Sequence, residues 1–249
     1  MNHRSPRADG LSTALMLTLS FGTGVLDAAT YLGLHQVFTA NMTGNVVFVG
    51  LGLADTADVP LLRAALALVG FVAGATAAGL LQRCRTAVWP NADGIVASVL
   101  LTVAAAVGSC AVVLHVVDLG EAGLDALTAA LAAAMGAQAV AARRVAVGDV
   151  STVVVTSTLA GLFAEAVWSG GTASRAATLR RAGAVATMMA GAVVGAFVLK
   201  VSLALAVAVP AALLLVVGLV VALRVLRRRR QPVEHDRVVG AEDRHTVRT

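Results

Sequence analysis

An acidic residue and a polar turn interrupt apolar sequence near the start of the chain. Asp27 lies in a run that is otherwise strongly hydrophobic, and the sequence Asn41-Met42-Thr43-Gly44-Asn45 follows soon after it. An acidic side chain inside hydrocarbon costs about 2.5 kcal/mol or more unless it finds a partner or water. Such a carboxylate can carry a proton or bind a solute. The alternative is that it accepts hydrogen bonds from the turn and holds a broken helix in place.

The turn itself contains residue types that bind ligands. Asn41, Thr43 and Asn45 have short side chains that can cap a helix, and Gly44 lets a ligand or a neighbouring helix approach the backbone closely. If a short helix begins here, its free N–H groups and positive dipole end favour a carboxylate or another small anion. The same residues also suit a turn that only satisfies its own backbone among packed helices.

A second polar cluster has a similar spacing in the other half of the chain. Gln138 comes shortly after Gly136, much as Asp27 comes shortly after Gly24, and Thr156 and Thr158 come later. We interpret Gln138 as the counterpart of Asp27, with Thr156 and Thr158 mirroring Thr43 and Asn45. The spacing suggests an internal repeat whose two clusters could share one site. Ordinary hydrogen bonding between helices is the alternative.

Composition identifies the kind of protein that must position these residues. The 249 residues are 58% hydrophobic and only 13% charged, whereas a soluble domain has about 25% charged residues. Several apolar segments exceed the roughly 17 residues that a membrane-spanning helix needs. The sequence therefore predicts an all-α polytopic membrane protein. Its apolar segments are 11–34, 38–54, 61–82, 94–116, 122–142, 150–168, 182–199 and 203–223.

The basic residues indicate how many of these eight segments cross the membrane. If all eight crossed, the basic loops after the third and fifth segments would lie outside, against the positive-inside rule. If the second and sixth segments enter and leave on one side, every basic loop becomes cytoplasmic. We therefore expect about six transmembrane helices plus two short broken or re-entrant segments. The residues concerned are Arg83, Arg85, Arg143, Arg144, Arg175, Arg180, Arg181 and Arg227 to Arg230.

This topology defines the expected domain organisation. Residues 1–10 form a cytoplasmic N-terminal segment, 11–223 a single transmembrane domain, and 224–249 a basic, disordered cytoplasmic tail. The transmembrane domain divides into repeats 11–116 and 122–223. With six spans these repeats have inverted orientations, as in many transporters.

The run from Gly24 to Ala54, GVLDAATYLGLHQVFTANMTGNVVFVGLGLA, resembles the signature of the bacterial YoaK or DUF1275 family, also called the UPF0700 group. The resemblance covers residues 11 to about 223. It implies a bacterial inner-membrane protein of about six spans, and brings no established substrate or reaction. Relatives are expected to carry a second Thr and an acid soon after the Thr-x-Thr-Leu run. This chain instead reads Ala160-Gly161-Leu162, with its acid at Glu165.

Several function classes have no support in the sequence. There is no nucleophile elbow, Walker loop, His-Glu-x-x-His motif or Cys/His cluster. Cys84 and Cys110 show no metal-binding or redox spacing, and 4% aromatic residues offer no stacking platform for nucleic acid. We expect no enzymatic activity, no metal or cofactor and no nucleic-acid partner.

The expected function is that of a small secondary transporter or channel for a small polar or anionic solute. The alternative is a non-transporting membrane scaffold or sensor component whose broken segments serve only packing. The bilayer is the expected partner in both cases, and the oligomeric state is left open. The candidate binding residues are Asp27, Asn41, Thr43, Gly44, Asn45, Gln138, Thr156 and Thr158.

Overall fold

The computed structural model of the chain describes residues 6–55, 58–86, 92–145 and 175–230. These residues form helices and a few short connections, without strands, so the all-α prediction is confirmed. Long apolar runs favour helices in a membrane because a helix satisfies its own backbone hydrogen bonds. The helices are α1 (Pro6–Gly33), α2 (Met42–Leu53), α3 (Leu61–Thr86), α4 (Ala92–Val116), α5 (Glu121–Val145), α7 (Arg175–Leu199) and α8 (Leu203–Arg230).

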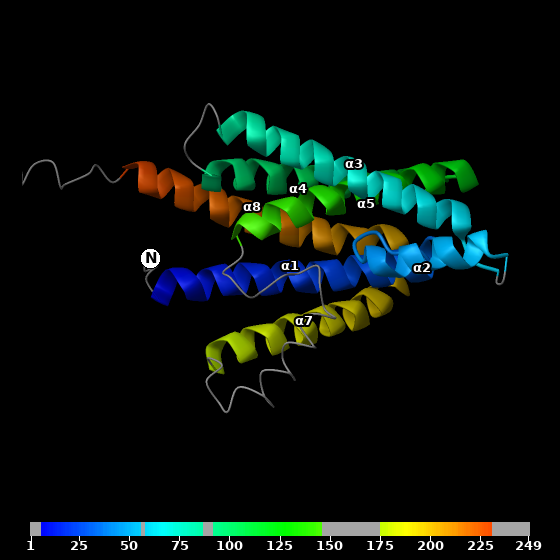
Figure 1. Cartoon of the computed structure of the whole chain (residues 1–249), viewed down its shortest axis with the longest axis horizontal. Helices are drawn as coiled ribbons and strands as arrows, with labels where there is room; N and C mark the ends of the chain where they lie inside the picture. The colour runs from blue at the N-terminus through cyan, green and yellow to red at the C-terminus, as the bar shows by residue number, and fades with distance from the viewer. Residues whose placement is uncertain (1–5, 56–57, 87–91, 146–174, 231–249) are drawn as a thin grey trace, which may run out of the picture.

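Six of the described helices are long and apolar enough to cross a membrane, and α2 is not. With 12 residues, α2 is about 18 Å long, whereas the hydrocarbon core is about 30 Å thick. Figure 1 shows α1, α4 and α7 running one way and α3, α5 and α8 the other, with α2 beginning and ending near one end of the bundle. The prediction that the second segment does not cross is confirmed. The predicted segment 150–168 lies outside the described residues.

The two halves of the bundle repeat the same packing. Helix α1 packs along α7 just as α5 packs along α3, and α4 and α8 pack along each other. Helix α1 also contacts α8, and α5 contacts α4. The outer helices α3 and α7 are equally exposed, each with 17% of its span buried. Because corresponding helices run in opposite directions (Figure 1), the halves form an inverted repeat.

Two glycines fix the register of this repeat. Gly24 of α1 lies against the backbone of α7 at Met188, and Gly136 of α5 lies against α3 at Phe71. At both positions a Cβ would overlap the carbonyl oxygen of the facing residue. Glycine is therefore required at equivalent points of both halves, because only a missing side chain lets these helices approach so closely. This register aligns Gly24 with Gly136.

The helices extend beyond the predicted transmembrane domain at both ends. Helix α1 begins at Pro6, and α8 continues to Arg230. The prediction of a disordered tail from residue 224 is therefore wrong for residues 224–230. Arginine is a good helix former, so the helix continues past the apolar part of the span.

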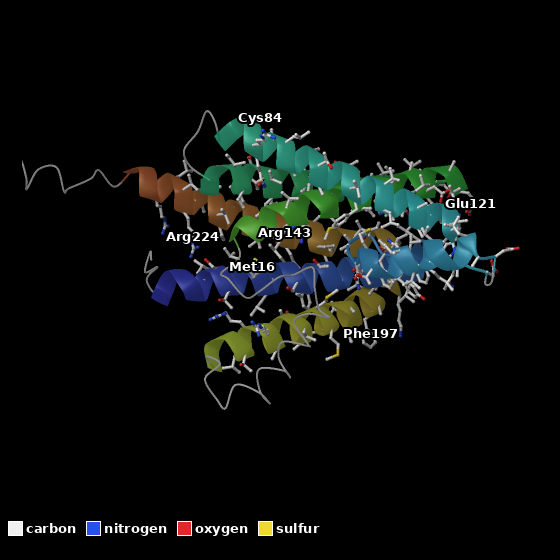
Figure 2. The ribbon with its side chains drawn as sticks, viewed as in Figure 1. Met16, Cys84, Glu121, Arg143, Phe197 and Arg224 are labelled. Carbon is white, nitrogen blue, oxygen red and sulfur yellow. The ribbon has the colours of Figure 1, made fainter. Side chains whose placement is uncertain are left out.

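Charge is distributed unequally between the two ends of the bundle. Figure 2 shows Arg143 and Arg224 toward the end where α1 begins, which we call the basic end, and Glu121 toward the opposite, acidic end. Helix directions place Arg83 and Arg180 at the basic end as well, and Asp118 at the acidic end. This asymmetry matches the charge bias that sets membrane orientation.

Candidate functional site

The chain folds back into the bundle immediately after α1. His35 and Gln36 have left-handed backbone angles, with φ of 61° and 64°, and the N–H of Gln36 donates to the carbonyl of Tyr31 at 2.9 Å. These two residues reverse the chain. The loop formed by residues 37–41 then runs back beside α1 to the level of Asp27, about 9 Å from the end of the helix at 1.5 Å per residue.

Asp27 holds the inner end of this loop. Its side chain is only 5% exposed, and its Oδ1 accepts hydrogen bonds from the N–H groups of Thr39 at 3.1 Å and Ala40 at 2.8 Å. The other carboxylate oxygen, Oδ2, is buried and has no hydrogen-bond partner among the described residues. One oxygen is therefore used to position the loop, and the second is buried without a hydrogen-bond partner among the described residues.

Asn45 binds the same loop from α2. Its side chain is fully buried, its Oδ1 accepts a hydrogen bond from the N–H of Phe38 at 3.1 Å, and its Nδ2 donates to the carbonyl of Phe38 at 2.6 Å. Both backbone polar groups of Phe38 are thus satisfied by one side chain. In this structure Asn45 is a structural residue and does not present its amide to a solute.

The ring of Phe38 explains the glycine in the turn. It stacks on Tyr31 with the ring centroids 4.8 Å apart, and the ring of Phe48 lies on the same stack at 6.3 Å. A Cβ at Gly44 would come within 2.8 Å of the Phe38 ring. The close approach predicted at Gly44 is therefore made by an aromatic side chain of the protein.

A groove of about 600 Å³ runs between α1, α7 and the loop. Its walls are mainly apolar, and its polar side chains are those of Asp27, Asn41 and Tyr31. Met189 is 66% exposed on its rim, so the groove opens on the side of the bundle rather than at an end. The lining residues are Gly24, Asp27, Ala28, Tyr31, Leu32, Phe38, Asn41, Val185, Met188, Met189, Ala192, Val193 and Ala196.

The structure brings together only part of the predicted site. Asn41 precedes α2, makes no side-chain cap, and lines the groove with Asp27. Thr43 is exposed and is not part of the groove lining. Thr156 and Thr158 lie outside the described residues. Asp27 therefore accepts its hydrogen bonds from Thr39 and Ala40, which precede the predicted turn, and of the turn residues only Asn41 lines the groove with it.

Gln138 occupies a different place from the one predicted. The glycine register aligns Asp27 with Ala139, so the interpretation of Gln138 as its counterpart is wrong by one residue, which turns the side chain to another face of the helix. Gln138 is buried, and its Nε2 donates to Oγ1 of Thr23 at 3.4 Å. It thus links α5 to α1 near the centre of the repeat and makes no contact with the groove.

Sequence reasoning missed several buried polar residues on α1. Ser20, Thr23 and Thr30 are buried on the same side of the helix as Asp27. Their spacing of three or four residues is the period of one helix face, so this pattern could have revealed the polar stripe. Thr39 is also fully buried, but nothing in the sequence distinguishes it from an exposed loop residue.

A charged cluster lies at the acidic end near this loop. Nε of Arg63 on α3 donates to Asp125 on α5 at 2.6 Å, and its Nη2 pairs with Glu121. Nε2 of His35 lies 3.7 Å from the same Glu121 carboxylate. The cluster therefore connects α3, α5 and the turn that follows α1.

Comparisons with known proteins agree with the membrane fold. The profile of the family described as "Protein of unknown function (DUF1275)" matches residues 15–220. The UPF0700 transmembrane protein YoaK of Bacillus subtilis (strain 168) is 38% identical over 79 residues, which are 31% of this chain and 35% of that protein. The match thus spans about a third of the curated relative. No solved structure matches the chain significantly.

Proposed function

The chain belongs to the DUF1275 family of membrane proteins, and from its fold we propose that it is a secondary transporter or channel for a small polar solute. The observation that carries this proposal is that buried Asp27 holds the loop leading into α2, a helix too short to cross the membrane. A buried acid beside a broken helix is the arrangement in which many carriers bind solutes and coupling ions.

The inverted repeat supports the same proposal. In carriers built this way, two similarly packed halves of opposite orientation can exchange roles, so that a central site faces one side of the membrane and then the other. Here α1 with α7 and α5 with α3 are such equivalent pairs, and each pair is in close contact at a glycine. A scaffold has no need for two halves with the same packing in opposite orientations.

The carboxylate of Asp27 limits the charge that a bound solute can carry. The sequence predicted a polar or anionic solute because a helix N-terminus attracts anions. However, the carboxylate of Asp27 already accepts the N–H groups of Thr39 and Ala40. A second anion at this point is repelled while Asp27 is ionised. We therefore favour a neutral or cationic solute, with an anion bound only when Asp27 carries a proton.

The proposal places the protein in a bacterial inner membrane with the basic end toward the cytoplasm. The positive-inside rule gives this orientation, because Arg83, Arg143 and Arg224 lie toward one end. The N-terminus of α1 and the C-terminus of α8 are at that end too (Figure 1). The groove beside Asp27 then lies nearer the outer surface.

A specific observation favours the alternative of a non-transporting scaffold or sensor component. The reciprocal bonds between Asn45 and Phe38, and the fit of that ring over Gly44, serve packing alone. In this alternative Asp27 only completes the same packing. A response to small solutes distinguishes the two functions.

The test uses purified full-length protein and a panel of amines, amino acids, sugars and carboxylates. Each solute is first screened for protection against thermal unfolding, because a solute at 100 times its dissociation constant stabilises its binding state by about 2.7 kcal/mol. Stabilising solutes are then tested for uptake into proteoliposomes with and without an imposed proton gradient. Saturable uptake supports the proposal. Absence of both stabilisation and uptake throughout the panel favours the scaffold.

A further inference from the structure

We propose that the groove between α1 and α7 binds an organic cation with an apolar body, and that the positive group of this ligand lies at Oδ2 of Asp27. The idea that this cation is transported rests on the proposed function. The idea that it binds rests on the groove alone. It names the chemical class of ligand that the same site would take.

The size and walls of the groove suit a small amphipathic molecule. Its volume of about 600 Å³ is in the range of small-molecule sites, which is about 300–1,000 Å³. Helix α7 contributes Met188, Met189 and Val193 to one wall. Methionine adapts to irregular apolar shapes, so this wall can accept hydrocarbon of different forms. A fully polar solute would leave most of the wall without favourable contacts.

The polar part of the groove calls for a donor with positive charge. Asp27 is 5% exposed, and its Oδ2 has no partner among the described residues. A buried carboxylate with one oxygen unpaired is costly, and a cation removes that cost by pairing with it. Because Thr39 and Ala40 bind Oδ1, the carboxylate is already oriented before the ligand arrives.

The aromatic side of the groove also favours a positively charged ligand. Tyr31 and Phe38 both line it and are stacked on each other. A cation above an aromatic face is attracted by the ring, and more strongly where water is excluded. Because Phe38 stacks on both Tyr31 and Phe48, Tyr31 is the lining ring with a face outside this stack. An organic cation thus finds a carboxylate and the ring of Tyr31, whereas an organic anion is repelled by the carboxylate.

No basic side chain of the protein competes for Asp27 among the described residues that line the groove. Lys200 directly follows α7, and its Nζ lies 4.9 Å from the centroid of the Phe197 ring, which is outside the groove. Leu32 is 60% exposed and Val193 is 52% exposed. The groove is therefore open along the lipid-facing side of the bundle, where an amphipathic amine dissolved in the membrane can reach it.

The test measures binding of 2-phenylethylamine to the full-length protein in lipid nanodiscs. Its comparison ligands are 2-phenylethanol, which is neutral, and 3-phenylpropionate, which is anionic, because both have similar apolar bodies. Asp27→Asn keeps an oxygen for the loop amides and removes the charge, while Asp118→Asn removes an exposed carboxylate elsewhere. Nanodiscs without protein correct for partition of the amine into lipid.

A second pair of variants tests the groove with its carboxylate intact. Ala28→Leu places a larger side chain in the lining, and Ala77→Leu makes the same change on an exposed face of α3 outside the groove. Saturable binding of the amine should weaken at least about tenfold in Asp27→Asn, the loss expected for one charged hydrogen bond. It should also weaken in Ala28→Leu and be unchanged in both control variants.

Three results would overturn this inference: no saturable amine binding, equal binding of the neutral alcohol, or unchanged binding in Asp27→Asn. Equal binding of the alcohol would mean that the groove is only an apolar crevice for lipid. Other results would reject the proposed transport function or the ligand class separately. If the amine binds through Asp27 but is never taken up into proteoliposomes, the site stands and transport is rejected. If another solute is transported while the amine neither binds nor competes, the ligand class is rejected.

Discussion

Asp27 and Asn45 hold the loop between α1 and α2 from two sides. Asp27 accepts the N–H groups of Thr39 and Ala40, and Asn45 pairs with both backbone groups of Phe38. Consecutive residues of the loop are thus fixed by one side chain from each flanking helix. The loop can remain buried because its backbone is satisfied, which is the condition for irregular structure inside a membrane protein. Asn45 has no spare group after doing this, whereas Asp27 keeps Oδ2.

Replacement of Asn45 should cost stability, because Asn45→Ala leaves the N–H and carbonyl of Phe38 unpaired. Each unsatisfied buried group costs about 1–3 kcal/mol. We expect a loss of about 2 kcal/mol or more in the free energy of unfolding, measured by denaturant titration in detergent. Thr43→Ala, at an exposed position of the same helix, should change it little. Equal effects of the two variants would contradict the structural role of Asn45.

The two halves should respond alike to substitution of equivalent glycines. In Gly24→Ala and in Gly136→Ala the new methyl group meets a facing backbone carbonyl, and such overpacking costs about 1–3 kcal/mol. We expect similar losses of thermal stability in both variants. Gly79 is the matched control, because a Cβ there has open space and alanine favours a helix by about 1 kcal/mol. A large loss in only one half would contradict the equivalence of the halves.

The Arg63 cluster should derive most of its stability from Asp125. The side chains of Arg63 and Asp125 are 21% and 18% exposed, whereas Glu121 is 70% exposed. Exposed ion pairs contribute about 0–1 kcal/mol because water screens them. Double-mutant cycles with Arg63→Gln, Asp125→Asn and Glu121→Gln should give a larger coupling energy for the pair with Asp125. A larger coupling with Glu121 would mean that burial does not determine the strength of these pairs.

Labelling from the two sides of the membrane tests the topology. Single cysteines at Ala54, Leu119 and Val201, in a background without Cys84 and Cys110, should react with an impermeant thiol reagent from the same side. A cysteine restored at Cys84 should react from the other side. The reason is that α2 returns to the acidic end, from which α3 crosses to the basic end (Figure 1). Reaction of Ala54→Cys from the side of Cys84 would show that α2 crosses.

Sequence reasoning could predict the spans and the broken segment because both depend on local properties. Apolar length identifies crossing helices, and α2 is too short to be one. The charge pattern predicted the same for the second segment, since each basic loop had to be on one side. The polar turn was predicted to start a short helix at Asn41, and α2 begins at Met42.

Other features depend on contacts that the sequence does not contain. The loop is reversed by His35 and Gln36, which are not glycines and give no strong signal for left-handed backbone. The partner of Asn45 is the backbone of Phe38, and any residue has that backbone. The register of the repeat depends on which carbonyls face Gly24 and Gly136. Spacing in the sequence does not contain this information, so it matched Asp27 with Gln138 instead of the next residue, Ala139.

We expect Asp27 to carry the proton in gradient-driven transport, because its Oδ2 is buried without a partner among the described residues. Transport by Asp27→Asn tests this role most directly. The measurement compares gradient-driven uptake with solute exchange in proteoliposomes, using the best solute from the stability screen. Asp118→Asn serves as the control for charge, and an unchanged elution profile confirms that the variant is folded. We expect Asp27→Asn to abolish gradient-driven uptake and, at a solute concentration raised to offset its weaker binding, to leave exchange largely intact. Uptake at the rate of the unmodified protein in Asp27→Asn would contradict the account.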